Sequence, residues 1–212
     1  MKFNDFVKNY RESIVIDSST FAWLAENPRD IRRQVRGWVK KGYLFPLKKG
    51  IYILSDDYRK INPSKLFIAN FLVAPSYISL EYALGFYDLI PEKVTVYTSV
   101  TTKKTAAYKN CLGRFEYRSV HRDVFFGFTK TSESGQEFFI ARPEKAVLDF
   151  FYFRKELKGK KDEFESLRFQ NLDILDTETL REFSKKFTKK VNNVTRAFVD
   201  FVQSEKEEYK AL

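Results

Sequence analysis

The 212-residue sequence is poor in the residues on which many functional sites depend. Its single cysteine, Cys111, excludes an intrachain disulfide and fits a reducing compartment. Its single histidine, His121, leaves no set of histidine and cysteine ligands for zinc. The glycine-rich phosphate loops of nucleotide-binding enzymes are also missing. We therefore expect no metal, no cofactor and no catalytic residue, hence a protein that is not an enzyme.

Long hydrophobic runs are missing as well. Residues 1–5 lack the apolar stretch of a signal peptide, and no window approaches the roughly 20 apolar residues that a membrane span needs. We therefore expect a cytoplasmic protein without a membrane partner.

Apolar side chains and positive charge are plentiful. The sequence is 43% hydrophobic and contains 22 phenylalanines, which favours a folded chain over a disordered one. The formal net charge is +10. A surplus of this size makes a polyanion, either a nucleic acid or an anionic membrane, the first partner to consider.

The first 60 residues follow the element order of a winged helix-turn-helix. Periodicity and capping residues predict helices over 3–10, 21–25 and 28–41, and strands over 43–48 and 51–54. Asn27, Pro28 and Asp30 suit the start of the third helix, and Gly42 suits its end. Lys49 and Gly50 form the turn of the predicted hairpin. The polar segment 55–63 follows, and we place a domain boundary there.

The rest of the chain, residues 61–212, is predicted as a mixed α/β domain with helices at its C-terminal end. We expect helices over 66–73, 79–87 (capped by Ser79), 144–154, 177–187 and 191–209. Strands are expected over 94–100, 115–120, 124–129 and 137–141, and a charged loop over 158–162. The whole chain is therefore predicted to be α+β, with domains at 1–60 and 61–212.

The predicted helix 28–41 has two contrasting faces. Ile31, Val35, Trp38 and Val39 fall on one side, where they can pack on the preceding helix. A second side carries five cations, at i, i+3, i+4, i+7 and i+11: Arg29, Arg32, Arg33, Arg36 and Lys40. Such a helix fits the major groove of double-stranded DNA, where arginine can bind guanine edges or phosphates. Gln34, near the N-terminal end, is also a residue type that reads bases.

The alternative interpretation of this helix is a solvated basic face on an ordinary surface helix. The elements that follow favour DNA binding, because a hairpin with Lys48 and Lys49 at its tip is placed where a wing touches flanking phosphates. The predicted DNA-binding residues are therefore Arg29, Arg32, Arg33, Gln34, Arg36, Lys40, Lys48 and Lys49.

Three stretches of the sequence resemble the antitoxin family of the AbiE abortive-infection systems, which are type IV toxin–antitoxin systems. The first is Trp38–Leu44 running into Leu47–Tyr52, similar to the family's helix, glycine, strand and basic-turn wing. The second is Tyr77–Leu84, similar to its YxS…AL helix, and the third is Ile140–Asp149, similar to its PEKAxxD helix. The resemblance covers roughly residues 17–155.

The resemblance implies a transcriptional repressor that binds its own promoter, with inverted repeats as the expected operator. It also implies an antitoxin that counters a nucleotidyltransferase-like toxin. It assigns the DNA contacts to the helix and wing residues named above, and assigns no residue to toxin neutralisation. A stand-alone regulator of the same build, without a toxin, remains a second hypothesis.

A nucleic-acid-modifying enzyme is a third hypothesis, from another class. Glu137, Glu144 and Lys145 invite a nuclease interpretation, but Glu144 and Lys145 are adjacent on a predicted helix and should point apart. Lys145 and Asp149 are better explained as an intrahelical ion pair. His121 is expected in a turn, and the aromatic run 150–153 in the core.

Overall fold

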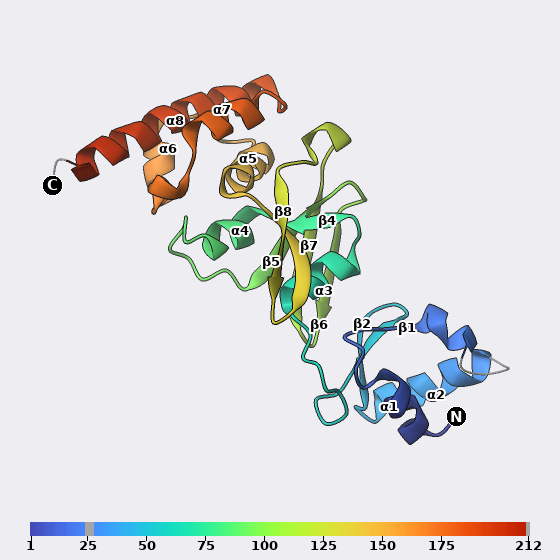
Figure 1. Cartoon of the computed structure of the whole chain (residues 1–212). Helices are drawn as coiled ribbons and strands as arrows, with labels where there is room; N and C mark the ends of the chain where they lie inside the picture. Colours follow the sequence, from blue (N-terminus) through green and yellow to red (C-terminus); the bar gives the residue numbers. More distant parts are fainter. Residues whose placement is uncertain (24–27, 211–212) are drawn as a thin grey trace.

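A computed structural model describes residues 1–23 and 28–210. These residues have an α+β fold with two separate β-sheets and helices at both ends. The N-terminal elements lie at one end of an elongated molecule and the C-terminal helices at the other (Figure 1). None of the described helices has the length and apolarity needed to cross a membrane.

The N-terminal part is a small helical layer on a three-stranded sheet. Its elements are α1 (Phe3–Tyr10), β1 (Ile16–Asp17), the 3-10 helix η1 (Ser18–Trp23), α2 (Pro28–Lys40), β2 (Leu44–Lys48) and β3 (Ile51–Leu54). The strands are antiparallel in the order β1-β3-β2. The expected helices over 3–10 and 28–41 and the expected hairpin are confirmed, with ends shifted by no more than one residue.

Gly42 ends α2 as the sequence predicted. Its φ is +74°, a left-handed conformation that is strained for residues with a Cβ. The Gly42 amide donates to Val39 O at 3.0 Å, and the Tyr43 amide donates to Trp38 O at 2.9 Å. This pair of bonds is a Schellman motif, which satisfies the last carbonyls of the helix and turns the chain into β2.

The helix expected over 21–25 is a tighter 3-10 helix that begins earlier, at Ser18. Asp17 explains the difference, because its carboxylate accepts from the Ser19 amide and its carbonyl accepts from the Thr20 hydroxyl. These local bonds compete with α-helical hydrogen bonding. The end of the expected helix and its neighbour Asn27 lie outside the described residues.

The second part is built around a six-stranded mixed sheet. Its strands are β4 (Ser76–Ile78), β5 (Val96–Thr101), β6 (Ala106–Asn110), β7 (Gly113–Ser119), β8 (Phe128–Glu133) and β9 (Gln136–Ala141). The order is β6-β7-β5-β4-β9-β8, with parallel pairs at β5·β7 and β4·β9 and antiparallel pairs elsewhere.

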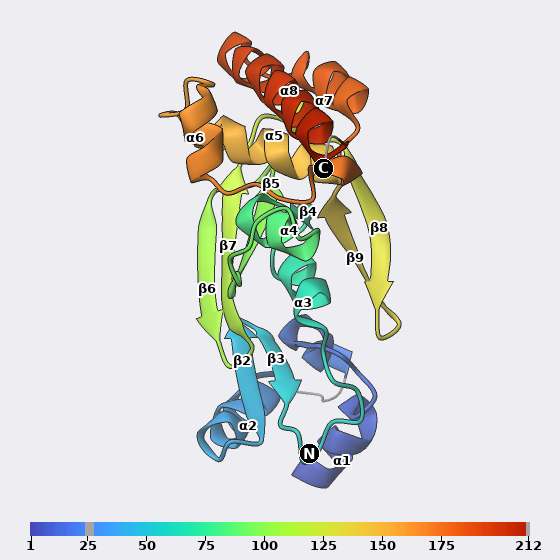
Figure 2. The ribbon, with the colours of Figure 1, turned by 90° about the vertical axis from the view of Figure 1, so that its left-hand side faces the viewer.

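Helices lie against both faces of this sheet (Figure 2). On one face, Tyr117 of β7 donates to the carbonyl of Ala69 in α3 (Lys65–Leu72). On the other face, Tyr77 of β4 meets α5 (Pro143–Phe153), which also packs on α4 (Leu80–Phe86). The C-terminal elements cover α5: α6 (Lys161–Ser166), η3 (Leu172–Ile174), α7 (Thr177–Ser184) and α8 (Lys189–Lys210).

Several local expectations about this part were incomplete or wrong, among them the helix expected over 177–187, which ends at Ser184. Strands β4 and β6 were not expected, because β4 has only three residues and β6 contains the weak strand formers Ala106 and Ala107. The strand expected over 124–129 starts at Phe128, after the 3-10 helix η2 (Arg122–Val124). The charged segment 158–162 leads into α6, whose start is stabilised by Glu163 accepting from three backbone amides.

Candidate nucleic-acid interface

One side of α2 belongs to the core of the N-terminal part. Ile31, Val35 and Trp38 are buried there, together with Phe6 and Phe21. The Trp38 ring lies 4.8 Å from that of Phe6, centroid to centroid. This packing fixes the rotation of α2 about its own axis, so its other side must face away from the core.

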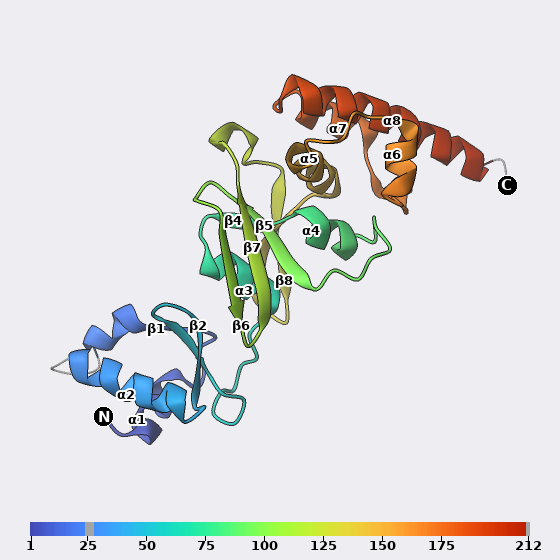
Figure 3. The ribbon, with the colours of Figure 1, turned by 180° about the vertical axis from the view of Figure 1, so that it is seen from behind.

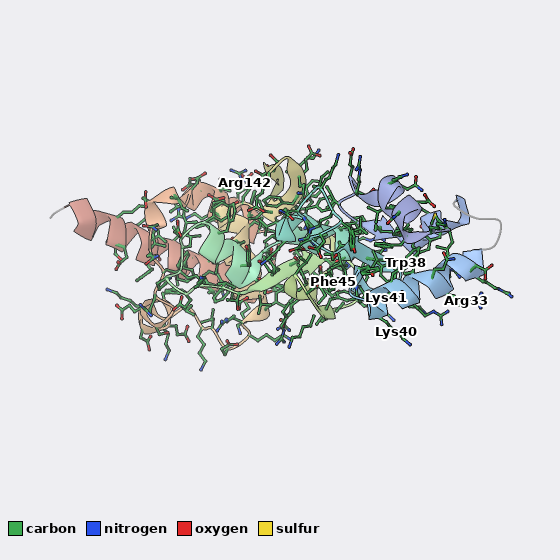
Figure 4. All side chains as sticks on the ribbon, turned by 90° about the horizontal axis from the view of Figure 1, so that it is seen from below. Arg33, Trp38, Lys40, Lys41, Phe45 and Arg142 are labelled. Atoms are coloured by element: carbon green, nitrogen blue, oxygen red, sulfur yellow. The ribbon has the colours of Figure 1, made fainter. Side chains whose placement is uncertain are left out.

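That other side carries the predicted cations. Arg29, Arg32, Arg33, Arg36 and Lys40, together called the guanidinium face, are all exposed. In Figure 4, Arg33 and Lys40 project from the outer side of α2, whereas Trp38 lies toward the interior of the N-terminal part. The structure therefore brings together five of the eight predicted DNA-binding residues on one surface.

Few acidic groups neutralise the guanidinium face. Arg33 pairs with Asp30 at 3.1 Å, in the open, where its own side chain is 81% exposed. Within residues 1–23 and 28–210, Arg32, Arg36 and Lys40 have neither an ion pair nor a side-chain hydrogen bond. The spacings Arg32–Arg36 and Arg36–Lys40 are i, i+4, and like charges at this spacing destabilise a helix by about 0.2–0.5 kcal/mol. Helix stability therefore does not explain this arrangement, whereas an anionic partner would.

Gln34 does not lie on the guanidinium face. It is half-buried, and its Oε1 is buried without a hydrogen-bond partner among the described residues. At 100° per residue it falls beside Trp38, on the packed side of the helix. The structure therefore places Gln34 apart from the arginines with which the sequence analysis grouped it.

The predicted wing residue Lys48 also points elsewhere. Its ammonium donates to the carbonyl of Leu72, at the end of α3, at 2.5 Å. The β2–β3 hairpin runs up to the end of β6, where Asn110 donates to the carbonyl of Leu47 at 3.2 Å (Figure 3). Lys48 thus makes an intramolecular contact, while Lys49, at the turn, is exposed.

The other two stretches of the resemblance meet in a buried polar network. Lys145 and Asp149 are completely buried and form the expected i, i+4 ion pair on α5. Tyr77 accepts from Lys145 Nζ at 2.8 Å and donates to Asp149 Oδ2 at 2.9 Å, and Ser79 donates to the same Oδ2 at 2.8 Å. Ser79 occupies the N-cap position of α4, but its side chain makes no capping bond. The most distinctive polar residues of these stretches therefore hold α5 against β4.

Burial and aromatic rings define the electrostatics of this network. Burial lowers the pKa of Lys145 and raises the pKa of Asp149, so each charge depends on the other. Lys145 Nζ also lies 5.2 Å from the ring centroid of Phe126 and 4.9 Å from that of Phe187. The negative faces of such aromatic rings attract the positive charge of the Lys145 ammonium. A charge pair that is closed off from solvent and hydrogen-bonded to Tyr77 and Ser79 supports the fold.

Comparisons with known proteins add no relative: no family model matches the chain, and no curated protein matches it either.

The residues weighed for catalysis are separated in space. Glu144 Oε1 accepts from the Asp176 amide at 3.1 Å, so Glu144 and Lys145 point apart as expected. Glu137 pairs with Lys130 on β8. His121 lies at the start of η2, 3.0 Å from Asp123. No group of three potential metal ligands gathers anywhere in the described part of the chain.

The aromatic run 150–153 serves the core, as expected for the buried Phe150 and Phe151. Tyr152 and Phe153 are half-buried and pack against the same apolar cluster. No exposed ladder of rings results on which nucleobases could stack.

Proposed function

We propose that this protein is a transcriptional regulator that binds double-stranded DNA through the guanidinium face of α2. The observation that carries the proposal is the division of α2 into a side locked by Trp38 and an opposite side of exposed cations. A helix held in this way can present several arginines to the major groove at once, for base edges and phosphates. Basic net charge adds attraction that is independent of sequence.

The element order supports a winged helix-turn-helix as the framework. Helix, strand, short helix, second helix and hairpin follow one another, and β1 closes the sheet beside β3. In this framework α2 takes the place of the recognition helix. The hairpin departs from the usual arrangement, since Lys48 contacts Leu72, and we therefore leave Lys48 out of the proposed DNA contacts. Lys49 stays in them.

We further propose that the regulator acts as the antitoxin of a type IV toxin–antitoxin system and represses its own operon. This step rests on the resemblance alone, with a nucleotidyltransferase-like toxin as the partner. Tyr77, Ser79, Lys145 and Asp149 are partnered inside the fold, so we assign them no direct contact with a toxin.

Promoter binding tests the first proposal. The triple variant Arg32→Ala, Arg33→Ala, Arg36→Ala should lose at least tenfold in affinity for the protein's own promoter, measured by fluorescence anisotropy. The matched control is Lys155→Ala, Lys158→Ala, Lys161→Ala, which removes the same charge from exposed positions around the start of α6. Equal losses in both variants would assign binding to net charge and refute the role of α2.

Growth rescue tests the second proposal. Induction of a neighbouring nucleotidyltransferase-like gene should arrest growth, and co-expression of this chain should restore it. Promoter binding without rescue would favour the stand-alone regulator. Metal-dependent cleavage or modification of nucleic acid by the purified chain would favour the enzyme.

A further inference from the structure

The β2–β3 hairpin has two buried faces. Leu44 and Leu54 join the core beneath α1 and α2. The residues that alternate with them face the other way: Leu47, Ile51 and Ile53 are buried in the core of the second part, and Phe45 packs against it. Figure 4 places Phe45 on the side of the N-terminal part that faces the second. The hairpin therefore contributes side chains to two hydrophobic cores and does not project freely into solvent.

Polar contacts fix the hairpin along its length. Lys48 Nζ reaches the Leu72 carbonyl, which the last turn of α3 leaves without a helical partner. From the neighbouring hairpin, Asn110 donates to the Leu47 carbonyl. These two bonds tie successive residues of β2 to two separate elements of the second part, α3 and β6.

The connecting segment 55–64 is held at both ends. Near its start, the Arg59 guanidinium donates to Leu54 O at 3.2 Å and pairs with Asp56 at 2.6 Å. At its end, Ser64 donates through its amide to Gln136 Oε1 at 2.9 Å and through its hydroxyl to Glu133 Oε2 at 2.6 Å. A flexible linker would leave such groups to solvent.

We propose that Lys48 is a positioning residue, which with Asn110 clamps the hairpin to the second part and so holds α2 in one orientation relative to the six-stranded sheet. The two parts of the chain then bind DNA as one rigid unit. The DNA readout rests on the proposed function, whereas the clamp itself does not.

Lys48→Met is the decisive variant, because methionine keeps the apolar stem and loses the donor. Lys49→Met removes the same charge one residue away and serves as the control for the distance measurement alone, because Lys49 belongs to the proposed DNA contacts. Both tryptophans, Trp23 and Trp38, precede residue 60, and the lone cysteine, Cys111, is exposed beside Asn110. Time-resolved energy transfer from the tryptophans to an acceptor on Cys111 therefore reports the arrangement of the two parts in the full chain. The labelled chain must keep its melting temperature.

We expect Lys48→Met to broaden the distribution of donor–acceptor distances and Lys49→Met to leave it unchanged. Asn110→Ala, an independent variant, should also broaden it. Promoter affinity should fall severalfold for Lys48→Met with an unchanged slope against salt, because no phosphate contact is lost. An unchanged distance distribution would overturn the proposal, and so would a salt slope smaller by about 0.9, the value for one phosphate contact. If the wild-type chain binds no promoter DNA, the proposed function fails while the distance measurement still decides on the clamp.

Discussion

Ser79 Oγ donates to Asp149 Oδ2 at 2.8 Å, across 70 residues of sequence. The bond joins the start of α4 to the middle of α5. It links two stretches that the sequence presents separately, Tyr77–Leu84 and Ile140–Asp149. The residues that these two stretches share with the family pattern therefore belong to one buried network. The same pattern in another chain would indicate the same packing, which is not yet evidence of a common activity.

The network predicts a large cost when one charge is removed. Lys145→Met leaves the Asp149 carboxylate buried with two hydroxyl donors and no cation. Breaking a buried pair in this way typically costs about 3–5 kcal/mol. We expect the free energy of unfolding, measured by urea denaturation, to fall by that amount.

The double variant Lys145→Met, Asp149→Leu is the matched control. It removes both charges, so no uncompensated ion remains, and it should be clearly more stable than Lys145→Met alone. Additive losses in the two positions would show that the ion pair is not the main interaction.

Two glycines, Gly37 inside α2 and Gly42 at its C-terminal cap, predict opposite effects. Gly42 has φ +74°, and a Cβ there meets nothing within 4 Å, so Gly42→Ala should cost about 1 kcal/mol through backbone strain alone. Gly37 lies inside α2, also in open space, so Gly37→Ala should stabilise by about 0.5–1 kcal/mol. Thermal unfolding should move down by a few degrees for the first and up for the second. A gain in stability for Gly42→Ala would contradict the Schellman cap.

Much of the N-terminal part could be predicted because its signals are local. Helical periodicity and Gly42 defined α2, and the Lys49-Gly50 turn defined the hairpin. The clamp could not be predicted in the same way, because its partners Leu72 and Asn110 are distant in sequence. One signal was nevertheless present. The runs Leu44–Leu47 and Ile51–Leu54 are apolar at nearly every position, which indicates strands buried on both faces and not a solvated wing.

The candidate nucleic-acid interface could also be predicted from the sequence only in part. The cations of α2 share a face because 3.6-residue periodicity dictates it. The placement of Gln34 and Lys48 was not predicted, because both were chosen by residue type and not by the direction of the side chain. Gln34 lies on the packed side of α2, and Lys48 is used by the carbonyl of Leu72.

Acid should weaken the structure through Glu163. Backbone amides of Lys158, Lys160 and Gly159 donate to its carboxylate and hold its pKa below the ordinary value of 4.5. A pKa that is lower in the folded chain means stability that is present above pH 4.5 and lost as pH falls through the lowered value. Glu163→Gln should therefore be less stable than wild type at pH 7, and the two melting temperatures should converge as the pH falls below 4.5. Glu165→Gln, on the same helix, controls for loss of charge. A gap that stays constant with pH would assign the effect of Glu163→Gln to geometry and not to charge.

The direction in which each side chain of α2 points predicts how its substitution affects DNA binding. Arg36 is exposed in the middle of the guanidinium face, whereas Gln34 is half-buried two residues earlier. If Arg36 contacts a phosphate, Arg36→Ala should reduce the slope of log affinity against log salt by about 0.9. If it binds a guanine edge, the variant should instead lose about 1–3 kcal/mol of discrimination at one base pair. Gln34→Ala should change neither quantity. Anisotropy titrations at several salt concentrations, on the promoter and on a set of single-base variants, separate these outcomes. A base-specific loss for Gln34→Ala with none for Arg36→Ala would place the DNA on the other side of the helix and refute the guanidinium face as the interface.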